Sequence, residues 1–317
     1  MSKTKGLIAA VLAYSAWGPL APLGTLLLDD MGPFTLNTVR TAGSLLLFGI
    51  TLGPRTLLRS VRLLGTDPRL WLLGIVGLGF TFGAYLGSLL FLEPTIAALL
   101  LYFSPLLVAW FARRSLGEPL PRLFLPTILV TIVGGALAIL EPTQGIQLGR
   151  GALFGLLLGA LGVFGWTFYT LYLKRLGTQY TDSELTLTAF LASGVVFLLA
   201  TLVTPGERFA IEVDGMTWIR MGLYILFPSF ISFQLYAMAV RNAGAAFTAT
   251  LLGIEIAATA VFSYILVGEQ FGWEKALGIG LVLASVTVFL VDDARRPLAV
   301  PAPSAPGQPE TQGNEPQ

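Results

Sequence analysis

The sequence is dominated by apolar stretches that are each long enough to cross a lipid bilayer as one helix. A membrane-spanning helix needs roughly 20 apolar residues to cross about 30 Å of hydrocarbon. Lipid offers no partner to free backbone N–H and C=O groups, so the stretches are predicted to be helices. The alternating polar pattern of a membrane β-barrel is absent from the sequence. Ten predicted spans cover residues 6–28, 34–53, 70–92, 95–112, 121–140, 151–173, 185–204, 217–240, 245–267 and 272–291.

Composition agrees with a chain that lies largely in a membrane. Charged residues make up 12% of the 317 residues and hydrophobic residues 55%, and the mean hydropathy is +0.77. This charged share is about half that of a soluble domain. The first span follows Lys3 and Lys5 but is too long for the apolar part of a signal peptide, so it is predicted to be a permanent helix. The loops at 92/95 and 240/245 are very short, which leaves nine or eleven spans as alternatives to ten.

Lysine and arginine are distributed unequally between the two sides of the predicted membrane. Basic residues gather on the cytoplasmic side of membrane proteins. With the N-terminus in the cytoplasm, fourteen basic residues fall on that side and four on the other. The sequence therefore predicts a multi-pass protein of the plasma (inner) membrane with both termini in the cytoplasm. The cytoplasmic residues are Lys3, Lys5, Arg55, Arg59, Arg62, Arg69, Arg113, Arg114, Arg122, Lys174, Arg175, Arg241, Arg295 and Arg296.

The residue types that are missing exclude several kinds of site. The net charge is +1, which gives no broad basic surface, so no nucleic-acid partner is predicted. The chain contains no Cys and no His. Thiolate nucleophiles, disulfides and the commonest metal ligand are therefore excluded. The glycines of span 70–92 are not followed by the Lys-Ser/Thr of a phosphate-binding loop. No cofactor and no metal site are predicted.

The two halves of the chain resemble each other at a shift of 151 residues. The shift aligns Leu116-Gly117-Glu118 with Val267-Gly268-Glu269, and Ser104-Pro105 with Glu255-Ile256. Each half holds five predicted spans, an odd number, so the second half enters the membrane upside down. Inverted repeats are typical of transporters, because two such halves can expose one central site to either side. The predicted fold is an all-α integral membrane protein of ten transmembrane helices in two inverted five-helix repeats, residues 1–145 and 146–296, followed by a disordered, proline-rich cytoplasmic tail, 297–317.

Seven short motifs follow one another along the chain. They are Ala16-Trp17-Gly18, residues 34–40, residues 97–105, Leu116-Gly117-Glu118, residues 162–166, residues 244–255 and Val267-Gly268-Glu269. In this order and spacing the sequence resembles the EamA-type members of the drug/metabolite transporter superfamily, over residues 5–292. The resemblance implies a ten-helix exporter of metabolites, amino acids or drugs and does not identify the substrate. Members often carry proline after the glutamate that matches Glu255. Here Ile256 follows, so whether the helix is interrupted at that point is open.

Two charged residues lie inside predicted spans. Glu255 is ten residues into its span, about 15 Å deep at 1.5 Å per residue. A carboxylate there costs ~2.5–3.5 kcal/mol unless it faces a cavity, pairs or binds a proton. It is interpreted either as a proton-coupling or substrate-amine site, or as a neutral side chain that bonds two helices. Arg40 lies about 9 Å below the start of its span. It either attracts a substrate carboxylate, pairs with Glu255 in one conformation, or extends outward to the interface.

Aromatic residues fall into two groups. Trp71, Trp110, Trp218 and Trp273 lie at span ends and are predicted interfacial anchors. Trp17 and Trp166 lie mid-span, at equivalent positions under a shift of 149. An indole N–H needs a partner, so the two are predicted to face each other across a wet cavity. Contact with lipid or helix packing is the alternative. The predicted substrate-binding residues are Tyr14, Trp17, Arg40, Tyr85, Tyr102, Trp166, Tyr169, Gln234 and Tyr236, with Glu255 as the proton-coupling residue.

The remaining polar and helix-bending residues have structural interpretations. Glu118 and Glu269 follow glycine at span ends, where capping and interfacial pairing with Arg122 and Lys275 are predicted. Proline removes a backbone hydrogen bond and bends a helix. Bends of this kind suit a rocking motion, and fixed kinks are the alternative. The mid-span prolines are Pro19, Pro22, Pro105 and Pro228.

The sequence favours a secondary transporter that exports small organic solutes by alternating access. A passive facilitator or channel with the same fold is the first alternative. An integral-membrane enzyme is the second, and it is disfavoured because the loops are short and His is absent. The predicted partners are a small-molecule substrate and the lipid bilayer. Oligomeric state is open, with a homodimer among the possibilities.

Overall fold

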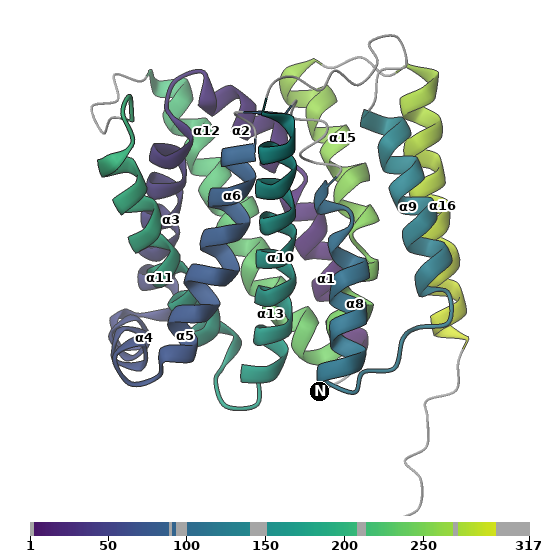
Figure 1. Cartoon of the computed structure of the whole chain (residues 1–317), viewed down its shortest axis with the longest axis horizontal. Coiled ribbons are helices and arrows are strands. Elements are labelled where there is room, and N and C mark those ends of the chain that lie inside the picture. Colours follow the sequence, from purple (N-terminus) through teal and green to yellow (C-terminus); the bar gives the residue numbers. More distant parts are fainter. Residues whose placement is uncertain are drawn as a thin grey trace, which may run out of the picture.

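In the computed structural model, the described parts of the chain are residues 3–88, 91–92, 100–139, 151–207, 214–268 and 272–295, and these contain helices and no strand. Most helices run side by side along one direction (Figure 1). In chain order the elements are α1 (Lys3–Trp17), α2 (Leu20–Leu28), α3 (Pro33–Leu52), α4 (Pro54–Thr66), α5 (Pro68–Leu72), η1 (Leu73–Gly79), α6 (Phe80–Ser88), α8 (Ser104–Ser115), α9 (Phe124–Ile139), α10 (Ala152–Leu176), α11 (Asp182–Val203), α12 (Gly215–Ile225), η2 (Leu226–Ile231), α13 (Ser232–Ala243), α14 (Ala245–Thr250), α15 (Gly253–Val267) and α16 (Trp273–Ala294).

Six helical segments in the described residues are long and apolar enough to cross a membrane. They are Lys3–Leu28, Ala152–Leu176, Asp182–Val203, Gly215–Ala243, Ala245–Val267 and Trp273–Ala294. Each matches one predicted span. The other four predicted spans correspond to α3, to α5–α6, to α8 and to α9, of which α9 contains a shorter apolar helix, Phe124–Leu137. The structure therefore shows an all-helical protein with six candidate spans, and the count of ten stays a prediction.

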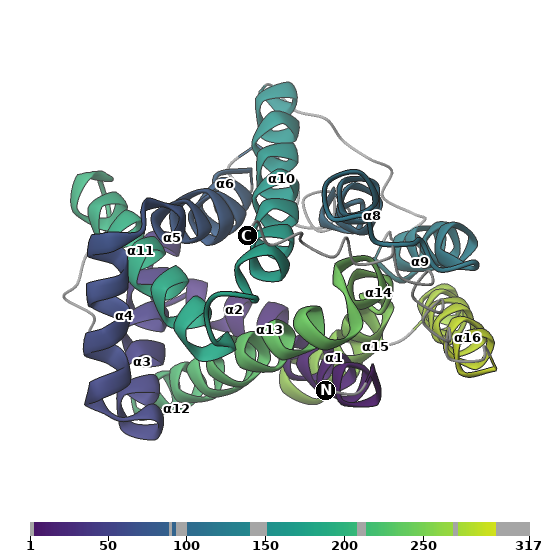
Figure 2. The same cartoon turned by 90° about the horizontal axis from the view of Figure 1, so that it is seen from below.

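The long helices of the first half pack against helices of the second half. The closest neighbours are α1 with α13, α3 with α11, α6 with α10, α8 with α14 and α9 with α16. Figures 1 and 2 show α6 beside α10, and α9 beside α16 at one edge of the molecule. If the two predicted halves are exchanged, the α1–α13 pair becomes the α10–α6 pair and the other three pairs map onto themselves. The two halves are therefore interlocked within one bundle.

Glycine allows these helices to approach closely. A Cβ atom at Gly165 of α10 would lie 2.7 Å from the backbone nitrogen of Thr81 in α6. A Cβ atom at Gly6 of α1 would lie 2.7 Å from the backbone nitrogen of Ala243 in α13. Small residues let helix backbones meet in a membrane, where van der Waals packing drives association.

Irregular turns interrupt the helices near the centre of the bundle. The π-helical segments η1 and η2 begin 153 residues apart, close to the shift that relates the halves. Pro228 lies inside η2, and Pro19 lies at the break between α1 and α2. A further break separates α14 from α15 at residues 251–252, where Leu252 N donates to Ala249 O. The helix is thus interrupted directly before Glu255, although no proline follows that residue.

The segment between spans 34–53 and 70–92 forms a helix, α4, that the search for apolar spans does not predict. It lies across one end of the bundle, so that Figure 1 shows it end-on and Figure 2 along its length. Its direction is therefore roughly perpendicular to the long helices. The four tryptophans predicted as anchors are exposed, from 36% at Trp71 to 72% at Trp273.

The start of α1 and the end of α16 lie at the same end of the bundle. Lys3 Nζ of α1 lies 2.6 Å from Asp293 Oδ1 of α16. This ion pair places the start of the first helix beside the end of the last. The predicted tail, 297–317, lies outside the described residues.

Candidate functional site

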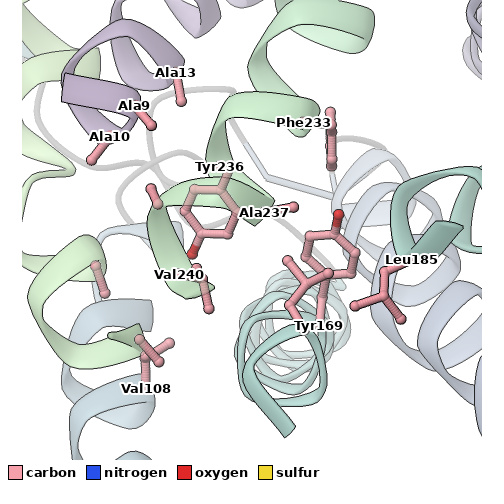
Figure 3. Packing of buried hydrophobic residues seen from close by; sticks show 14 of the residues in the cluster. Ala9, Ala10, Ala13, Val108, Tyr169, Leu185, Phe233, Tyr236, Ala237 and Val240 are labelled. Atoms are coloured by element: carbon pink, nitrogen blue, oxygen red, sulfur yellow. The ribbon is translucent and has the colours of Figure 1, made fainter. Parts of the chain in front are cut away.

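Aromatic rings from three helices meet in the middle of the bundle. Trp17 of α1 and Trp166 of α10 pack edge to face, with ring centres 5.4 Å apart. Tyr236 of α13 contacts both, at 5.2 Å and 5.0 Å. Tyr14 lies 5.6 Å from Trp17, and Tyr169 lies 5.6 Å from Trp166. The structure therefore brings these five predicted residues into one cluster, of which Figure 3 shows Tyr169 and Tyr236 within the core.

Trp17 and Trp166 face each other through direct contact, without open space between their rings. A centroid distance of 5.4 Å lies in the range of packed aromatic pairs. Trp17 is 3% exposed and also packs on Phe233, at 5.3 Å. Helix packing, the alternative interpretation of these residues, describes their contact in this structure. Their role in substrate binding stays a prediction.

Glu255 lies three residues into α15, directly after the helix break. Its side chain is half-buried. It is close enough to interact electrostatically with the hydroxyls of Tyr14, Tyr85, Tyr102 and Tyr236. These tyrosines come from α1, α6, the turn before α8, and α13. Four of the predicted binding residues are therefore grouped around the predicted proton-coupling residue.

Arg40 of α3 is buried, with 2% of its surface exposed. Its guanidinium lies over the ring of Phe82, 4.0 Å from the ring centre, and 5.8 Å from the ring centre of Tyr224. Such cation–π contacts attract a cation without neutralising it. In the described part of the chain no carboxylate pairs with Arg40, and its Nε atom has no hydrogen-bond partner. A buried charge without a counter-ion is costly, so the position suits an anionic group.

Two tyrosines, Tyr224 and Tyr85, lie within electrostatic range of the two charged residues. Tyr224, beside Arg40, interacts electrostatically with Tyr85, and Tyr85 interacts with Glu255. Among the described ion pairs, none joins Arg40 to Glu255 directly. In this conformation the cation and the carboxyl therefore do not pair with each other.

One predicted residue is engaged elsewhere. Gln234 of α13 donates from Nε2 to Ser183 Oγ near the start of α11, over 3.3 Å. Phe233 and Tyr236, on either side of it in the chain, supply the rings that join the aromatic cluster. The structure therefore does not place Gln234 among those rings.

Several residues of this region are absent from the predicted set, among them Phe82 beneath Arg40. Phe233 contacts Trp17, Trp166 and Tyr169. Its position three residues before Tyr236 puts it on the same helix face, a signal that the sequence does contain. Tyr224 is also missed, although its hydroxyl lies within predicted span 217–240, as that of Tyr236 does.

The fold and the paired halves agree with a comparison against known families. A model of the EamA-like transporter family matches residues 4–140 and, a second time, residues 153–291. The chain belongs to this family. It is therefore a multi-pass membrane transporter, embedded in lipid and acting on a small molecule.

The proteins similar to this EamA-like chain include two named relatives and a solved structure. It is 29% identical over 203 residues to an uncharacterized inner membrane transporter, YicL, of Salmonella typhimurium, which covers 63% of the chain and 65% of the relative. It is 24% identical over 292 residues to an uncharacterized transporter, YvbV, of Bacillus subtilis, covering 90% and 92%. A crystal structure superposes with a TM-score of 0.78 over 93% of this chain and 100% of the solved one, at 19% identity. At that identity the likeness shows the fold alone.

Carboxylates tie the two halves of the EamA-like chain together at both ends. At the end that carries α4, Glu118 accepts hydrogen bonds from Ala245 N and Ala246 N at 3.2 Å, and Lys174 Nζ lies 3.7 Å from it. Glu118 thus caps α14, which agrees with its predicted capping role, and its ionic partner is Lys174. At the opposite end, Glu207 accepts from Phe34 N and Thr35 N at 3.1 Å and 2.9 Å and so caps α3. Glu269 lies outside the described residues.

Proposed function

We propose that the protein is a secondary transporter that carries a small organic solute with both a carboxylate and an apolar or aromatic part. The observation that carries this proposal is the buried Arg40 guanidinium, which lacks an anionic partner in the described chain. A substrate carboxylate would supply that partner, and the aromatic cluster would receive the rest of the molecule by stacking and apolar contact. The proposed binding residues are Tyr14, Trp17, Arg40, Tyr85, Tyr102, Trp166, Tyr169, Gln234 and Tyr236.

The proposed architecture is ten transmembrane helices in two inverted repeats, 1–145 and 146–296. The double family match, the exchange symmetry of the helix pairs and the matching positions of η1 and η2 support it. The ion pair between Lys3 and Asp293 supports an even number of spans. Basic residues are concentrated at that end, so we place both termini in the cytoplasm.

The proposed mechanism is alternating access, coupled to protons through Glu255 and working in the direction of export. Two interlocked inverted halves can rock about a central site. Glu255 lies at a helix break, within electrostatic range of four tyrosine hydroxyls that could contact the substrate. A passive facilitator of the same fold is the alternative, because the same residues would then bind substrate without coupling.

Flux through purified protein in proteoliposomes tests this function. Aromatic and aliphatic carboxylates would be compared with the corresponding primary amides, with and without an imposed proton gradient. We expect saturable, gradient-driven accumulation of a carboxylate and no accumulation of its amide. Equal transport of acid and amide would contradict the role of Arg40. Transport that only equilibrates the solute, whatever the gradient, would favour the facilitator.

A further inference from the structure

Helix α4 has three distinct faces. At about 3.6 residues per turn, the spacing of Arg55, Arg59 and Arg62 puts them on one face. Ser60 and Leu64, on the opposite side, are buried against the bundle. A third face is apolar and exposed, with Leu58 at 59% and Val61 at 50% exposure. Apolar and basic faces side by side are typical of a helix that lies in the membrane interface.

The arginine face is only partly neutralised by the protein. Arg59 Nε lies 2.7 Å from Glu184 Oε1 of α11, and this pair fastens α4 to the bundle. Among the described ion pairs none involves Arg55 or Arg62, and both residues are exposed. Two uncompensated positive charges therefore remain on a helix at the end of the bundle.

An apolar groove adjoins this helix. It has a volume of about 410 Å³, and its walls include Leu46, Gly49 and Ile50 of α3, Leu57 and Val61 of α4, and Leu191 of α11. Leu46 and Ile50 are 66% and 70% exposed, so the groove opens on the outer surface of the bundle. The groove thus begins at the basic helix and runs along α3, one of the predicted spans.

We propose that α4 and this groove form a binding site for a phospholipid with an anionic headgroup. One acyl chain occupies the groove between α3, α4 and α11, and the phosphate and headgroup lie beside Arg55 and Arg62. The charge of the helix selects the headgroup, since basic residues at the membrane surface attract anionic lipid by about 1 kcal/mol each. The wholly apolar walls select an acyl chain and not a second charged group. This site is separate from the proposed substrate site and does not depend on it.

Native mass spectrometry of the purified full chain in detergent, titrated with phosphatidylglycerol or phosphatidylcholine of equal chain length, tests the proposal. We expect tighter binding of phosphatidylglycerol. The double variant Arg55→Gln/Arg62→Gln should weaken phosphatidylglycerol binding by about 30-fold, the fold-change for two residues at ~1 kcal/mol each, and leave phosphatidylcholine unchanged. The matched control is Arg113→Gln/Arg114→Gln, which removes two exposed arginines at the end of α8 and should change neither affinity.

A groove variant tests the acyl chain separately. A Cβ atom at Gly49 would have ordinary van der Waals contact with Leu57, 3.7 Å away, so Gly49→Leu fills the groove without displacing backbone. It should weaken binding of both lipids without lowering thermal stability, which helix propensity should raise slightly. Equal binding of the two lipids by the parent, or an equal loss in the α8 control, would overturn the headgroup site. Displacement of phosphatidylglycerol by soluble glycerol phosphate at equal concentration would show a free phosphate site and overturn the lipid proposal.

Discussion

Arg40 and Glu255 are the two ionisable side chains of the proposed transport site. Arg40 is enclosed by aromatic rings, whereas Glu255 is half-buried among tyrosine hydroxyls. No ion pair joins them in the described part of the chain, so they do not neutralise each other in this conformation. A conformation that brought them together would compete with substrate at Arg40 and with protons at Glu255. Binding of substrate and of protons would then be linked, as an antiporter requires.

Substitution of Glu255 tests this linkage. Glu255→Gln keeps the shape of the side chain and imitates its protonated state. We expect the variant to fold and bind substrate but to lose the dependence of transport on a pH gradient. The measurement is flux into proteoliposomes with and without the gradient, with Glu274→Gln in the first turn of α16 as a control carboxylate. If Glu255→Gln responds to the gradient as the parent does, Glu255 is a structural residue.

The paired tryptophans can be tested against an exposed one. Trp17→Ala and Trp166→Ala should each lower transport per folded molecule at least tenfold, because each removes a wall of the aromatic cluster. Burial of Trp17 also means a loss of stability, about 3–5 kcal/mol for a fully buried aromatic side chain. The matched control is Trp110→Ala, whose side chain is 58% exposed. Flux would be divided by the amount of folded protein. Unchanged flux per folded molecule would mean that the pair only packs helices.

At the scale of single residues, the sequence predicts part of the site and misses the rest for a physical reason. Trp17, Trp166 and Glu255 stand out because indoles and carboxylates are costly in the middle of a bilayer. Phe233 and Tyr224 do not stand out, since aromatic rings are common in apolar helices and the sequence does not show where each ring points. Their contacts depend on how helices turn relative to one another, which depth along a span does not determine.

Among the elements, α6 and α10 approach so closely that a methyl group at the contact would meet backbone. Gly165→Ala puts a methyl group 2.7 Å from the backbone of Thr81, and the opposing atom cannot move aside as a flexible side chain can. We expect a loss of about 1–3 kcal/mol in the free energy of unfolding, the usual cost of overpacking. Thermal unfolding in detergent measures it. Gly280→Ala in α16 is the control, because nothing lies within 4 Å of its Cβ, and helix propensity alone should stabilise it slightly.

The corner between α4 and α5 is held by one carboxylate. Asp67 accepts hydrogen bonds from Arg69 Nη2 and from Tyr180 OH, both over 2.7 Å, and so joins the two halves of the chain. The hydrogen bonds from Arg69, and then the one from Tyr180, hold the pKa of Asp67 well below its usual range, against the opposing effect of desolvation. A depressed pKa contributes stability above the unfolded pKa of about 3.9, and this contribution is lost as the pH falls below it.

This corner gives a prediction about pH. Asp67→Asn should lower the free energy of unfolding by about 1 kcal/mol at neutral pH, the worth of a partly exposed charged pair. The difference between parent and variant should shrink as the pH is lowered through about 4. Thermal unfolding across this range measures it, with the exposed Asp29→Asn as control. A difference that stays constant with pH would mean that the charge of Asp67 contributes nothing.

The elements themselves are predicted unequally well. Long apolar stretches predict membrane helices because the bilayer leaves the backbone no other choice. Helix α4 is not predicted as a span, because its arginines recur every third or fourth residue and lower its mean hydropathy. The break before Glu255 is not predicted either. The usual signal, a proline, is missing there, and Leu251 and Leu252 are residues that occur commonly within helices.

For the molecule as a whole, the capping contacts at the two ends restrict how the halves can move. Glu118 holds α14 at the end of the bundle with α4, and Glu207 holds α3 at the other. Both contacts join one predicted half to the other, so neither end can open while its contact is intact. Alternating access therefore requires that the two contacts break in turn, whereas a channel can break both together.

The absence of native cysteine makes this coupling measurable with introduced thiols. Glu118→Cys/Ala245→Cys, joined by a short bifunctional reagent, would lock the end that carries α4. Under alternating access, the locked protein should favour opening at the other end. A third cysteine, placed at Thr35, should then react with a water-soluble maleimide several-fold faster in the locked protein than in the unlocked one. The mirror experiment locks Thr35→Cys/Glu207→Cys and follows a cysteine at Ala245. Flux should stop in both locked forms and return when a cleavable reagent is cut. A reaction rate at the far end that does not change on locking would mean that the two ends open independently, as in a channel.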